Sequence, residues 1–199
     1  MNYPKLPSFR LDGKKALVTG AGRGIGMGAS IALAESGANV TLVSRTEKEL
    51  KDLTDHINSQ GYKASYEVLD VNAEDDVSSF VDKSDPFDIL INNAGINITG
   101  PIETAKMSDI KKVFDTNFFS HVNMIQKVLP NMRSNNKGLI INITSIAGYL
   151  GLPYWGTYCA SKSSFNLIAE SLNIELKKYN VNVVNIAPGD YKTEISSNR

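Results

Sequence analysis

The sequence predicts an α/β fold in which a doubly wound, mostly parallel sheet carries helices on both faces. Short β-rich runs alternate along the chain with longer amphipathic, charged segments, which is the order expected of βαβ units. Several of the runs, such as FDILIN at 87–92, are nearly continuous in apolar residues. Such runs are typical of strands that are covered on both faces. A glycine-rich turn follows the first run directly.

The predicted elements form one Rossmann-type domain, residues 1–199, that begins with a proline-containing arm at residues 1–12. Each strand is a short run rich in β-branched residues, and each segment between two strands has a helical pattern. The strands cover residues 15–19, 39–44, 63–70, 87–92, 138–144 and 181–187. The helices cover residues 24–37, 46–60, 73–83, 103–135 and 156–179.

Composition and charge exclude several classes of protein. The chain of 199 residues is 42% hydrophobic and 21% charged, which is ordinary for a soluble globular domain. Acidic and basic residues number 21 each, so we expect neither nucleic acid nor an anionic membrane as a partner. We see no signal peptide and no run of the roughly 18 apolar residues that span a membrane. Cys159 is the only cysteine, which excludes an internal disulfide, and we expect a cytoplasmic protein.

The turn TGAGRGIG at residues 19–26 joins the first strand to the first helix. Glycines at such a junction let the backbone approach a pyrophosphate, and the helix N-terminus offers its N–H groups to the phosphates. The spacing of Gly20, Gly24 and Gly26 is G-x-x-x-G-x-G rather than G-x-G-x-x-G. A plain strand-to-helix turn is the alternative. The place of the turn in an alternating α/β chain favours a dinucleotide site.

The end of the second predicted strand indicates which dinucleotide binds. An acid there would bind a ribose 2′-hydroxyl, whereas an arginine accommodates a 2′-phosphate. The chain has Ser44 and Arg45 at this point, and Arg23 lies in the glycine turn. Two guanidinium groups could hold a phosphate, so we expect NADP(H) rather than NAD(H). The alternative is that both arginines are solvated surface charges. Asp70 either meets the adenine or caps the next helix.

A group of polar residues follows the later strands. The carboxyl ends of parallel strands form the ligand-binding edge of such a sheet, and residues 92–95, 144–148 and 187–193 lie there. Tyr158 and Lys162 are four residues apart in the predicted helix 156–179, so they share one face. Reduction of a carbonyl by hydride needs a proton donor and support for the developing charge on oxygen. A lysine ammonium beside the phenol favours the phenolate, and a serine hydroxyl such as that of Ser145 can hold the same substrate oxygen.

These motifs resemble those of the short-chain dehydrogenase/reductase family. The TGxxxGxG and NNAG motifs of the family match residues 19–26 and 92–95, and the similarity extends over about residues 12–195. The resemblance implies that Tyr158 is the general acid/base, that Ser145 orients the carbonyl, and that Lys162 binds the nicotinamide ribose and lowers the pKa of Tyr158. The Asn–Ser–Tyr–Lys tetrad would comprise Asn117, Ser145, Tyr158 and Lys162, with Asn117 holding a water for a proton relay.

The resemblance also implies a set of cofactor contacts and no metal site. Asp70 and Val71 would lie by the adenine, Asn93 by its ribose, and the PGxxxT motif by the nicotinamide. The serine–arginine pair after the second strand, with Arg23, resembles the NADP-preferring branch of the family. The full set is Gly20, Arg23, Gly24, Ile25, Gly26, Ser44, Arg45, Asp70, Val71, Asn93, Ala94, Gly95, Tyr158, Lys162, Pro188, Gly189, Tyr191 and Thr193.

The chain departs from the family in length, because members usually continue beyond the PG motif. The substrate-covering loop and helices and a seventh, C-terminal strand are missing from this sequence. The Asn–Ser–Tyr–Lys tetrad and the two arginines lead us to expect a ketone or aldehyde reductase that acts reversibly on a small carbonyl or alcohol substrate. A 3-oxoacyl-acyl-carrier-protein reductase and a sugar or polyol reductase are alternatives. An inactive NADPH-binding module and an interaction subunit of a mixed oligomer are alternatives from other classes.

The remaining features have ordinary interpretations. His56 and His121 are expected at the surface rather than in a metal site. Trp155 either lines the substrate entrance or packs, and Cys159 packs against the sheet. Phe165, Ile168, Leu172 and Leu176 form an apolar stripe that predicts a core face. A second face of the same helix carries small residues, and we expect it to pack on the same helix of another subunit, as in the dimer of the family. This predicts a homodimer or homotetramer through the helices near 103–135 and 156–179. This face comprises Ala160, Ser164, Leu167, Ser171 and Ile174.

Overall fold

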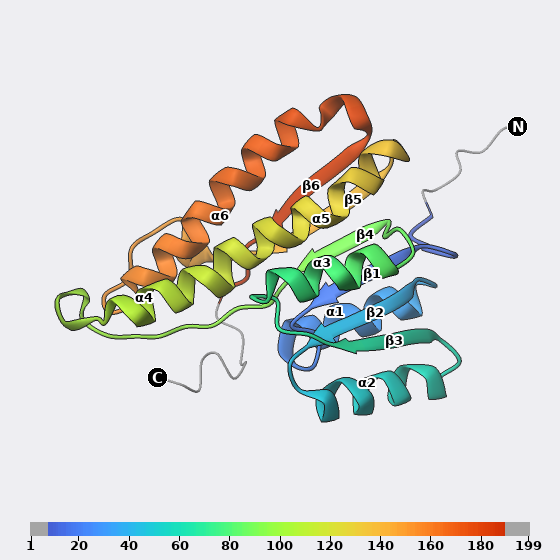
Figure 1. The fold of residues 1–199 in the computed structure, drawn as a ribbon, viewed down its shortest axis with the longest axis horizontal. Helices are drawn as coiled ribbons and strands as arrows, with labels where there is room; N and C mark the ends of the chain where they lie inside the picture. The colour runs from blue at the N-terminus through green and yellow to red at the C-terminus, as the bar shows by residue number, and fades with distance from the viewer. Residues whose placement is uncertain (1–7, 190–199) are drawn as a thin grey trace, which may run out of the picture.

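The computed structural model describes residues 8–189 of the chain. Six strands, all parallel, form one sheet in the order β3-β2-β1-β4-β5-β6 (Figure 1). The direction of winding reverses between β1 and β4, which in an open α/β sheet creates a crevice at the carboxyl ends of the strands. The predicted Rossmann-type sheet is confirmed. The strands are β1 (Lys15–Thr19), β2 (Asn39–Ser44), β3 (Lys63–Val68), β4 (Ile89–Asn92), β5 (Gly138–Ile143) and β6 (Val181–Ile186).

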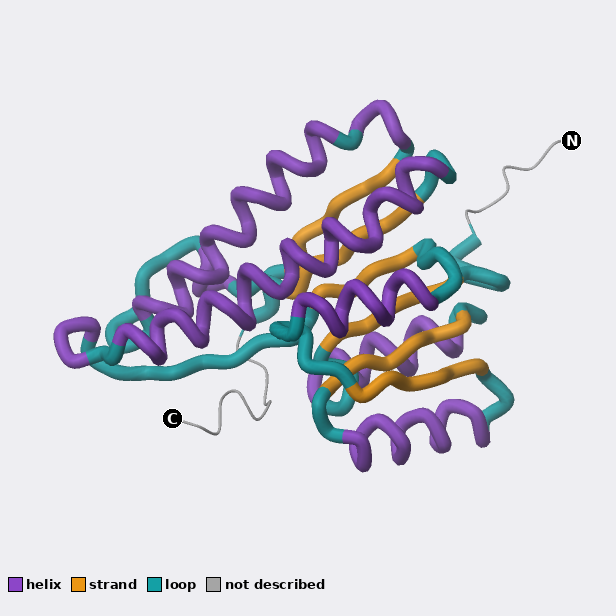
Figure 2. Tube along the Cα trace, in the orientation of Figure 1, coloured by secondary structure: helices purple, strands orange, loops and turns teal. Residues whose placement is uncertain are grey.

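Helices cover both faces of this sheet (Figures 1 and 2). Two of them, α1 and α2, contact β1, β2 and β3, and α3, α5 and α6 lie on the opposite side, where α5 contacts β4 and α6 contacts β6. No helix in the described part of the chain is long and apolar enough to cross a bilayer. The helices are α1 (Gly24–Glu35), α2 (Glu47–Ser59), α3 (Glu74–Lys83), α4 (Met107–Phe114), α5 (Ser120–Ser134) and α6 (Gly156–Glu175).

The central strands divide their side chains between two apolar layers. In β1, Ala16 and Val18 join the layer under α1 and α2, while Leu17 joins the layer under α3, α5 and α6. All three side chains are fully buried. This is the alternation that a strand imposes, since successive side chains point to opposite faces. The continuous apolar runs in the sequence therefore reflect burial on both sides.

The single helix predicted over residues 103–135 is wrong. A 3₁₀ turn (Ile102–Thr104) comes first, and Ala105 and Lys106 are extended before α4 begins at Met107. Ile102 is 67% exposed and Met107 is 64% exposed. Helices in proteins depend on burial of an apolar face, and the side chain of Ile102 is not buried. After α4, a π-helical segment (Asp115–Phe119) leads into α5.

The apolar stripe predicted along α6 is confirmed only in part. Phe165 and Leu176 are buried, and Leu172 packs against the same core from a partly buried position. Ile168 is instead 36% exposed. The helix ends at Glu175, and a 3₁₀ turn (Lys177–Tyr179) leads to β6.

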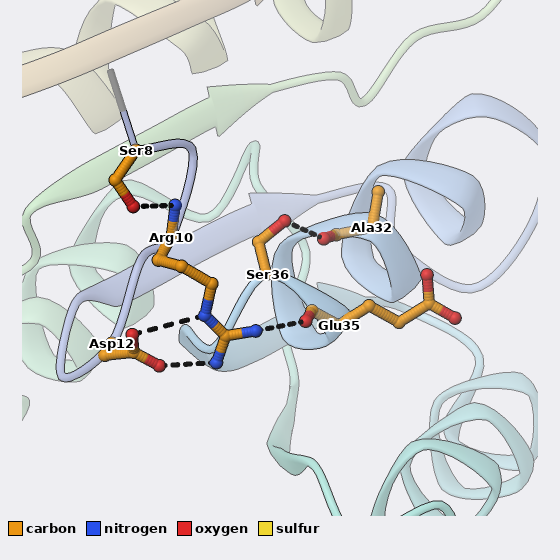
Figure 3. A network of polar contacts seen from close by, with 6 residues as sticks. All are labelled: Ser8, Arg10, Asp12, Ala32, Glu35 and Ser36. Carbon is orange, nitrogen blue, oxygen red and sulfur yellow. Dashed lines mark hydrogen bonds and ion pairs between the residues drawn. The ribbon is translucent and has the colours of Figure 1, made fainter. Parts of the chain in front are cut away.

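The described residues of the N-terminal arm lie against the end of α1 (Figure 3). The Arg10 guanidinium bonds both carboxylate oxygens of Asp12 and donates to the carbonyl of Glu35 at 3.3 Å. The Leu11 N–H donates to the Ser36 carbonyl at 2.8 Å. These contacts satisfy carbonyl groups that the last turn of a helix leaves without partners.

Candidate active site

The glycine turn brings its backbone unusually close to the loop that follows β4. Gly20 has φ of 61°, a conformation that favours glycine. A Cβ on Gly20 would lie 2.9 Å from the Ala94 Cα, and one on Gly26 would lie 2.3 Å from the Gly20 carbonyl oxygen. Only glycine fits at Gly26 without a backbone shift. The sequence pattern therefore reports real steric limits and not just a flexible connection.

Hydrogen bonds fasten the two loops together. The Thr19 hydroxyl accepts from the Asn93 N–H at 3.0 Å and from the Ala94 N–H at 3.2 Å. The Asn93 side-chain amide donates to the carbonyls of Thr19 and Gly20, both at 3.0 Å. The side chain of Asn93, which we expected beside a ribose, thus holds the glycine turn in place.

A cavity of about 640 Å³ lies along the carboxyl ends of the strands. This volume is within the range of small-molecule and cofactor sites. The structure brings most of the predicted residues together on its wall, although Gly26 and Asn117 lie behind it, and Tyr191 and Thr193 fall outside the described residues. The predicted residues that line it are Gly20, Arg23, Gly24, Ile25, Ser44, Arg45, Asp70, Val71, Asn93, Ala94, Gly95, Ser145, Tyr158, Lys162, Pro188 and Gly189.

Ser145 and Tyr158 meet at one end of the cavity. Ser145 follows β5 and its hydroxyl accepts from the Ala147 N–H at 3.1 Å, which fixes the side chain at the start of a 3₁₀ turn. Tyr158 lies in the first turn of α6, where its ring meets Trp155 edge-on at 5.7 Å. Burial raises the pKa of the Tyr158 hydroxyl, and a hydrogen bond with Ser145 lowers it in part. The phenol is therefore protonated at neutral pH.

Lys162 is almost completely buried, and its ammonium group donates to the Ile143 carbonyl at 2.9 Å. Its nitrogen lies 5.9 Å from the centre of the Tyr158 ring. Burial lowers the pKa of Lys162 to about 8, because the interior disfavours the charged form. The lysine remains charged at neutral pH. The pKa of Tyr158 is raised by burial in this structure. The lowering of this pKa by Lys162 therefore stays a prediction.

Asn117 lies in the π-helical segment between α4 and α5 and is fully buried. Its side chain accepts from the Ile96 N–H at 2.8 Å and donates to the Ile96 carbonyl at 2.9 Å. It also donates to the Ser161 hydroxyl at 3.1 Å, which in turn donates to the Tyr158 carbonyl at 2.8 Å. Asn117 thus joins the loop after β4 to the helix that carries Tyr158. π-Helical turns of this kind are frequent at functional sites.

His121 is buried, so its predicted surface position is wrong. Its Nε2 lies 2.7 Å from the Ala94 carbonyl oxygen, and its ring stacks on Phe165 with 4.7 Å between centroids. Burial first, and then the charge of Lys162, lower the pKa of His121 to about 3. The ring is therefore neutral, and Nε2 carries the proton that it donates to Ala94. The signal in the sequence is the spacing of four from Asn117, which puts His121 on the same buried side of the helix.

Both predicted arginines lie at the opposite end of the cavity, and each faces an acid. Arg45 is 4.0 Å from the carboxylate of Asp70, and Arg23 is 3.8 Å from that of Glu49. Both guanidinium groups are about two-thirds exposed. Screening by water makes such pairs weak. Asp70 also accepts from the Asn72 N–H at 3.0 Å, an Asx turn at the end of β3.

Several lining residues were missed by the sequence prediction. Most of them are apolar or small and carry no chemical signal. Separately, the described residues contain no group of three or more potential metal ligands. Trp155, for which packing was the alternative, does line the cavity. The other residues that were missed are Gly22, Met27, Thr46, Glu49, Leu69, Asn72, Ile96, Thr116, Ile143 and Thr144.

Comparison with known proteins agrees with this geometry. The family model for the short chain dehydrogenases matches residues 14–199. The chain belongs to the short-chain dehydrogenase family. It is 34% identical over 183 residues to the ketoacyl reductase HetN of Nostoc and 35% identical over 183 residues to a 3-ketodihydrosphingosine reductase of Bacteroides thetaiotaomicron. These matches cover 90% and 92% of this short-chain dehydrogenase, but it spans only 64% and 66% of those two relatives.

Solved structures of the family share the fold over nearly the whole chain. A gluconate 5-dehydrogenase from Burkholderia cenocepacia, in complex with NADP and tartrate, superposes with a TM-score of 0.90 at 32% identity. A 7α-hydroxysteroid dehydrogenase complexed with NADH and 7-oxo glycochenodeoxycholic acid gives 0.91 at 32% identity. The two comparisons cover 95% and 96% of this chain, and 76% of each of the other chains.

The close approach at Gly26 predicts a loss of stability on adding one methyl group. In Gly26→Ala the new Cβ would meet the Gly20 carbonyl, and overpacking of this kind costs about 1–3 kcal/mol. Urea denaturation measures the loss, and a fluorescence titration with NADPH should show weaker binding. Gly28→Ala is the matched control, because no atom lies within 4 Å of that Cβ. Its gain in helix propensity should add up to about 1 kcal/mol. Equal stability of the two variants would contradict the steric argument.

The buried neutral imidazole predicts a pH-dependent stability. The pKa of His121 is about 3 in the folded protein, against an ordinary value of 6.5, so between these values the unfolded chain binds more protons. Stability is therefore lost as the pH falls through 6.5. One such group removes about 1.4 kcal/mol between about pH 7.5 and about pH 5.5. Urea denaturation across this range measures the slope.

Two histidine variants test whether His121 causes this change of stability with pH. His121→Gln should flatten it, because the amide does not titrate and can still donate a hydrogen bond. His56→Gln, on the exposed side of α2, should leave it unchanged. A slope that persists in His121→Gln would show that another group is responsible.

Proposed function

We propose that this protein is an NADP(H)-dependent oxidoreductase that reduces a ketone or aldehyde to an alcohol and also catalyses the reverse reaction. The observation that carries the proposal is the pair of hydroxyl side chains, Ser145 and Tyr158, on one cavity wall with the buried Lys162, whose nitrogen lies 5.9 Å from the centre of the Tyr158 ring. The pair lies on the wall of a cavity that begins at the glycine turn. A catalytic site of this kind needs a proton donor, a hydrogen bond to the carbonyl oxygen and a positive charge nearby.

The residues present fit a dinucleotide. Gly20 and Gly24 line the cavity, and α1 begins at Gly24, so the first N–H groups of this helix could meet a pyrophosphate. Asp70 and Val71 line the end of the cavity that would hold the adenine, and Gly95 lines the stretch toward Tyr158. When bound, the nicotinamide supplies the hydride for reduction or accepts it in oxidation.

The side chains of this protein handle the proton. In the reduction, carbon gains a hydride, and the carbonyl oxygen takes the proton of the Tyr158 phenol, which leaves a phenolate. Ser145 holds that oxygen in place as its charge develops. The Lys162 ammonium favours the phenolate electrostatically, and the phenolate regains a proton from solvent. Asn117 does not line the cavity, and its side chain bonds Ile96 and Ser161; the relay role that we propose for it rests on the family resemblance.

The preference for NADP(H) rests on charge. Arg23 and Arg45 both line the end of the cavity away from Tyr158, where they can bind a 2′-phosphate. The gluconate 5-dehydrogenase structure contains NADP, which supports the preference, although the hydroxysteroid dehydrogenase structure contains NADH. We also propose a cytoplasmic location, because the single cysteine, Cys159, is free and buried, as is common in a reducing compartment.

The relatives support the proposed substrate class. Among them are a ketoacyl reductase, a 3-ketodihydrosphingosine reductase and a gluconate 5-dehydrogenase of Gluconobacter oxydans, which is 34% identical over 200 residues. A 3-oxoacyl-acyl-carrier-protein reductase and a sugar or polyol reductase are therefore the nearest alternatives. A nucleotide-binding protein without turnover is the alternative from another class.

We further propose a homodimer through α6 and the neighbouring part of α5. Leu167 and Ile174, both 65% exposed, lie on the face of α6 that we predicted to pack on a second copy. Leu167→Arg should place a charge in this contact. Light scattering at micromolar concentration is expected to give a dimer mass for the parent chain and a monomer mass for the variant. A monomeric parent would refute the contact.

Replacement of Tyr158 by Phe tests the proposed reaction. The variant keeps the ring but loses the proton donor, so turnover should fall by about 10²–10⁴-fold, while the affinity for NADPH stays within about threefold. Consumption of NADPH is measured by its absorbance with a panel of ketones, aldehydes, diketones and a β-ketoacyl ester. NADH is run in parallel.

Tyr62→Phe is the matched control, because Tyr62 is a partly exposed tyrosine next to β3, remote from the cavity. It should keep full activity. Undiminished turnover by Tyr158→Phe would refute the role of the phenol. Binding of NADPH without turnover by the parent on the whole panel would favour the nucleotide-binding alternative.

A further inference from the structure

A carboxylate reaches the glycine turn from the neighbouring helix. Glu49 lies in the first turn of α2, and its Oε1 is 3.8 Å from Nη1 of Arg23. A Cβ built on Gly22 would lie 2.6 Å from Oε2 of Glu49 and 3.4 Å from the hydroxyl oxygen of Ser44. The Glu49 carboxylate therefore occupies the space between Arg23, Gly22 and Ser44. All four residues line the cavity.

Capping of α2 does not explain this position. Thr46 and Glu49 have the spacing of a capping box, in which the glutamate would accept from the backbone N–H of the N-cap residue. Here the Thr46 N–H is directed to the Ser44 hydroxyl at 3.4 Å, and the Thr46 side chain makes no capping bond. The Glu49 carboxylate pairs instead with Arg23.

The space that Glu49 occupies adjoins the expected place of a cofactor phosphate. Arg23 and Ser44 are two of the three residues that we expect around the ribose 2′ position, with Arg45 as the third. A phosphate at Arg23 would meet the Glu49 carboxylate, and like charges a few ångströms apart repel strongly when partly shielded from water. A ribose hydroxyl would instead find a hydrogen-bond acceptor, which is the usual role of an acid at this point of the fold.

We propose that Glu49 sets the nucleotide specificity of the site by opposing the 2′-phosphate of NADP(H) and accepting a hydrogen bond from the ribose of NAD(H). This inference rests on the proposed nucleotide site. The two arginines favour the phosphate and Glu49 disfavours it, so the chain binds both dinucleotides. Its preference for NADP(H) is smaller than Arg23 and Arg45 alone would give.

Neutralising the carboxylate tests this role by binding alone. Dissociation constants of NADPH, NADH and adenosine 2′-phosphate are measured by fluorescence or calorimetry on the 199-residue chain and on Glu49→Gln. The variant should bind NADPH and adenosine 2′-phosphate about 10-fold more tightly, and NADH no more tightly than the parent. The ratio of the NADH to the NADPH dissociation constant should rise by at least the same factor.

Glu47→Gln is the matched control, because Glu47 is an exposed acid in the same turn of α2. It removes the same charge from the same helix terminus, so its effect on the ratio should stay below about twofold. Glu49→Ser, which also removes the bulk of the side chain, should repeat the change seen with Gln. Thermal unfolding of each variant without nucleotide establishes that it folds.

An unchanged ratio in both Glu49 variants, or equal effects at Glu47 and Glu49, would overturn the assignment while leaving the proposed function intact. Weaker binding of NADPH by Glu49→Gln would also overturn it, since Glu49 would then be a support for Arg23. If the folded parent chain binds neither NADPH nor NADH, the proposed function fails, and the role of Glu49 fails with it.

Discussion

The site depends on the hydrogen bonds by which Thr19 and Asn93 join the end of β1 to the loop after β4. These strands lie on either side of the point where the winding reverses, so their loops diverge unless something holds them together. The Thr19 hydroxyl accepts from two backbone N–H groups of the β4 loop, and the Asn93 amide donates to two carbonyls of the glycine turn. Loss of either side chain would leave partners unpaired in a poorly hydrated place, at about 1–3 kcal/mol each.

Further buried hydrogen bonds connect the loop after β4 to the helices packed on it. The Ala94 carbonyl is held by His121, and both backbone groups of Ile96 are held by Asn117. From Asn117 the bonds run through Ser161 to the carbonyl of Tyr158. The glycine turn and the reactive phenol are therefore parts of one connected network. Buried hydrogen-bond networks make a site rigid, although Nδ1 of His121 has no partner in this one.

The sequence predicted this network only where a residue type carries an unmistakable signal. Runs of β-branched residues located the six strands, and the runs are most continuous where both faces are buried, as in β1 and β4. The edge strand β3 is mostly exposed instead. The spacing of Tyr158 and Lys162 predicted that the two share one helix face, and both side chains line the cavity. Glu49 gave a misleading signal, since its spacing from Thr46 fits a capping box that the structure does not form. His121 gave only its spacing of four from Asn117, because a neutral buried imidazole is defined mainly by its surroundings in the fold.

The two errors in the helices both involve exposed apolar residues. An apolar pattern alone does not show which side chains are covered: Ile102 is exposed in a 3₁₀ turn before α4, and Ile168 is exposed although α6 is helical there. Val184 and Ile186 of β6 are similarly 44% and 46% exposed, on the face of the sheet opposite α6. The groups that would handle hydride and proton are instead held from the interior, by β1, β4, β5 and the helices packed on them. Their positions therefore depend on buried contacts and not on these exposed apolar side chains.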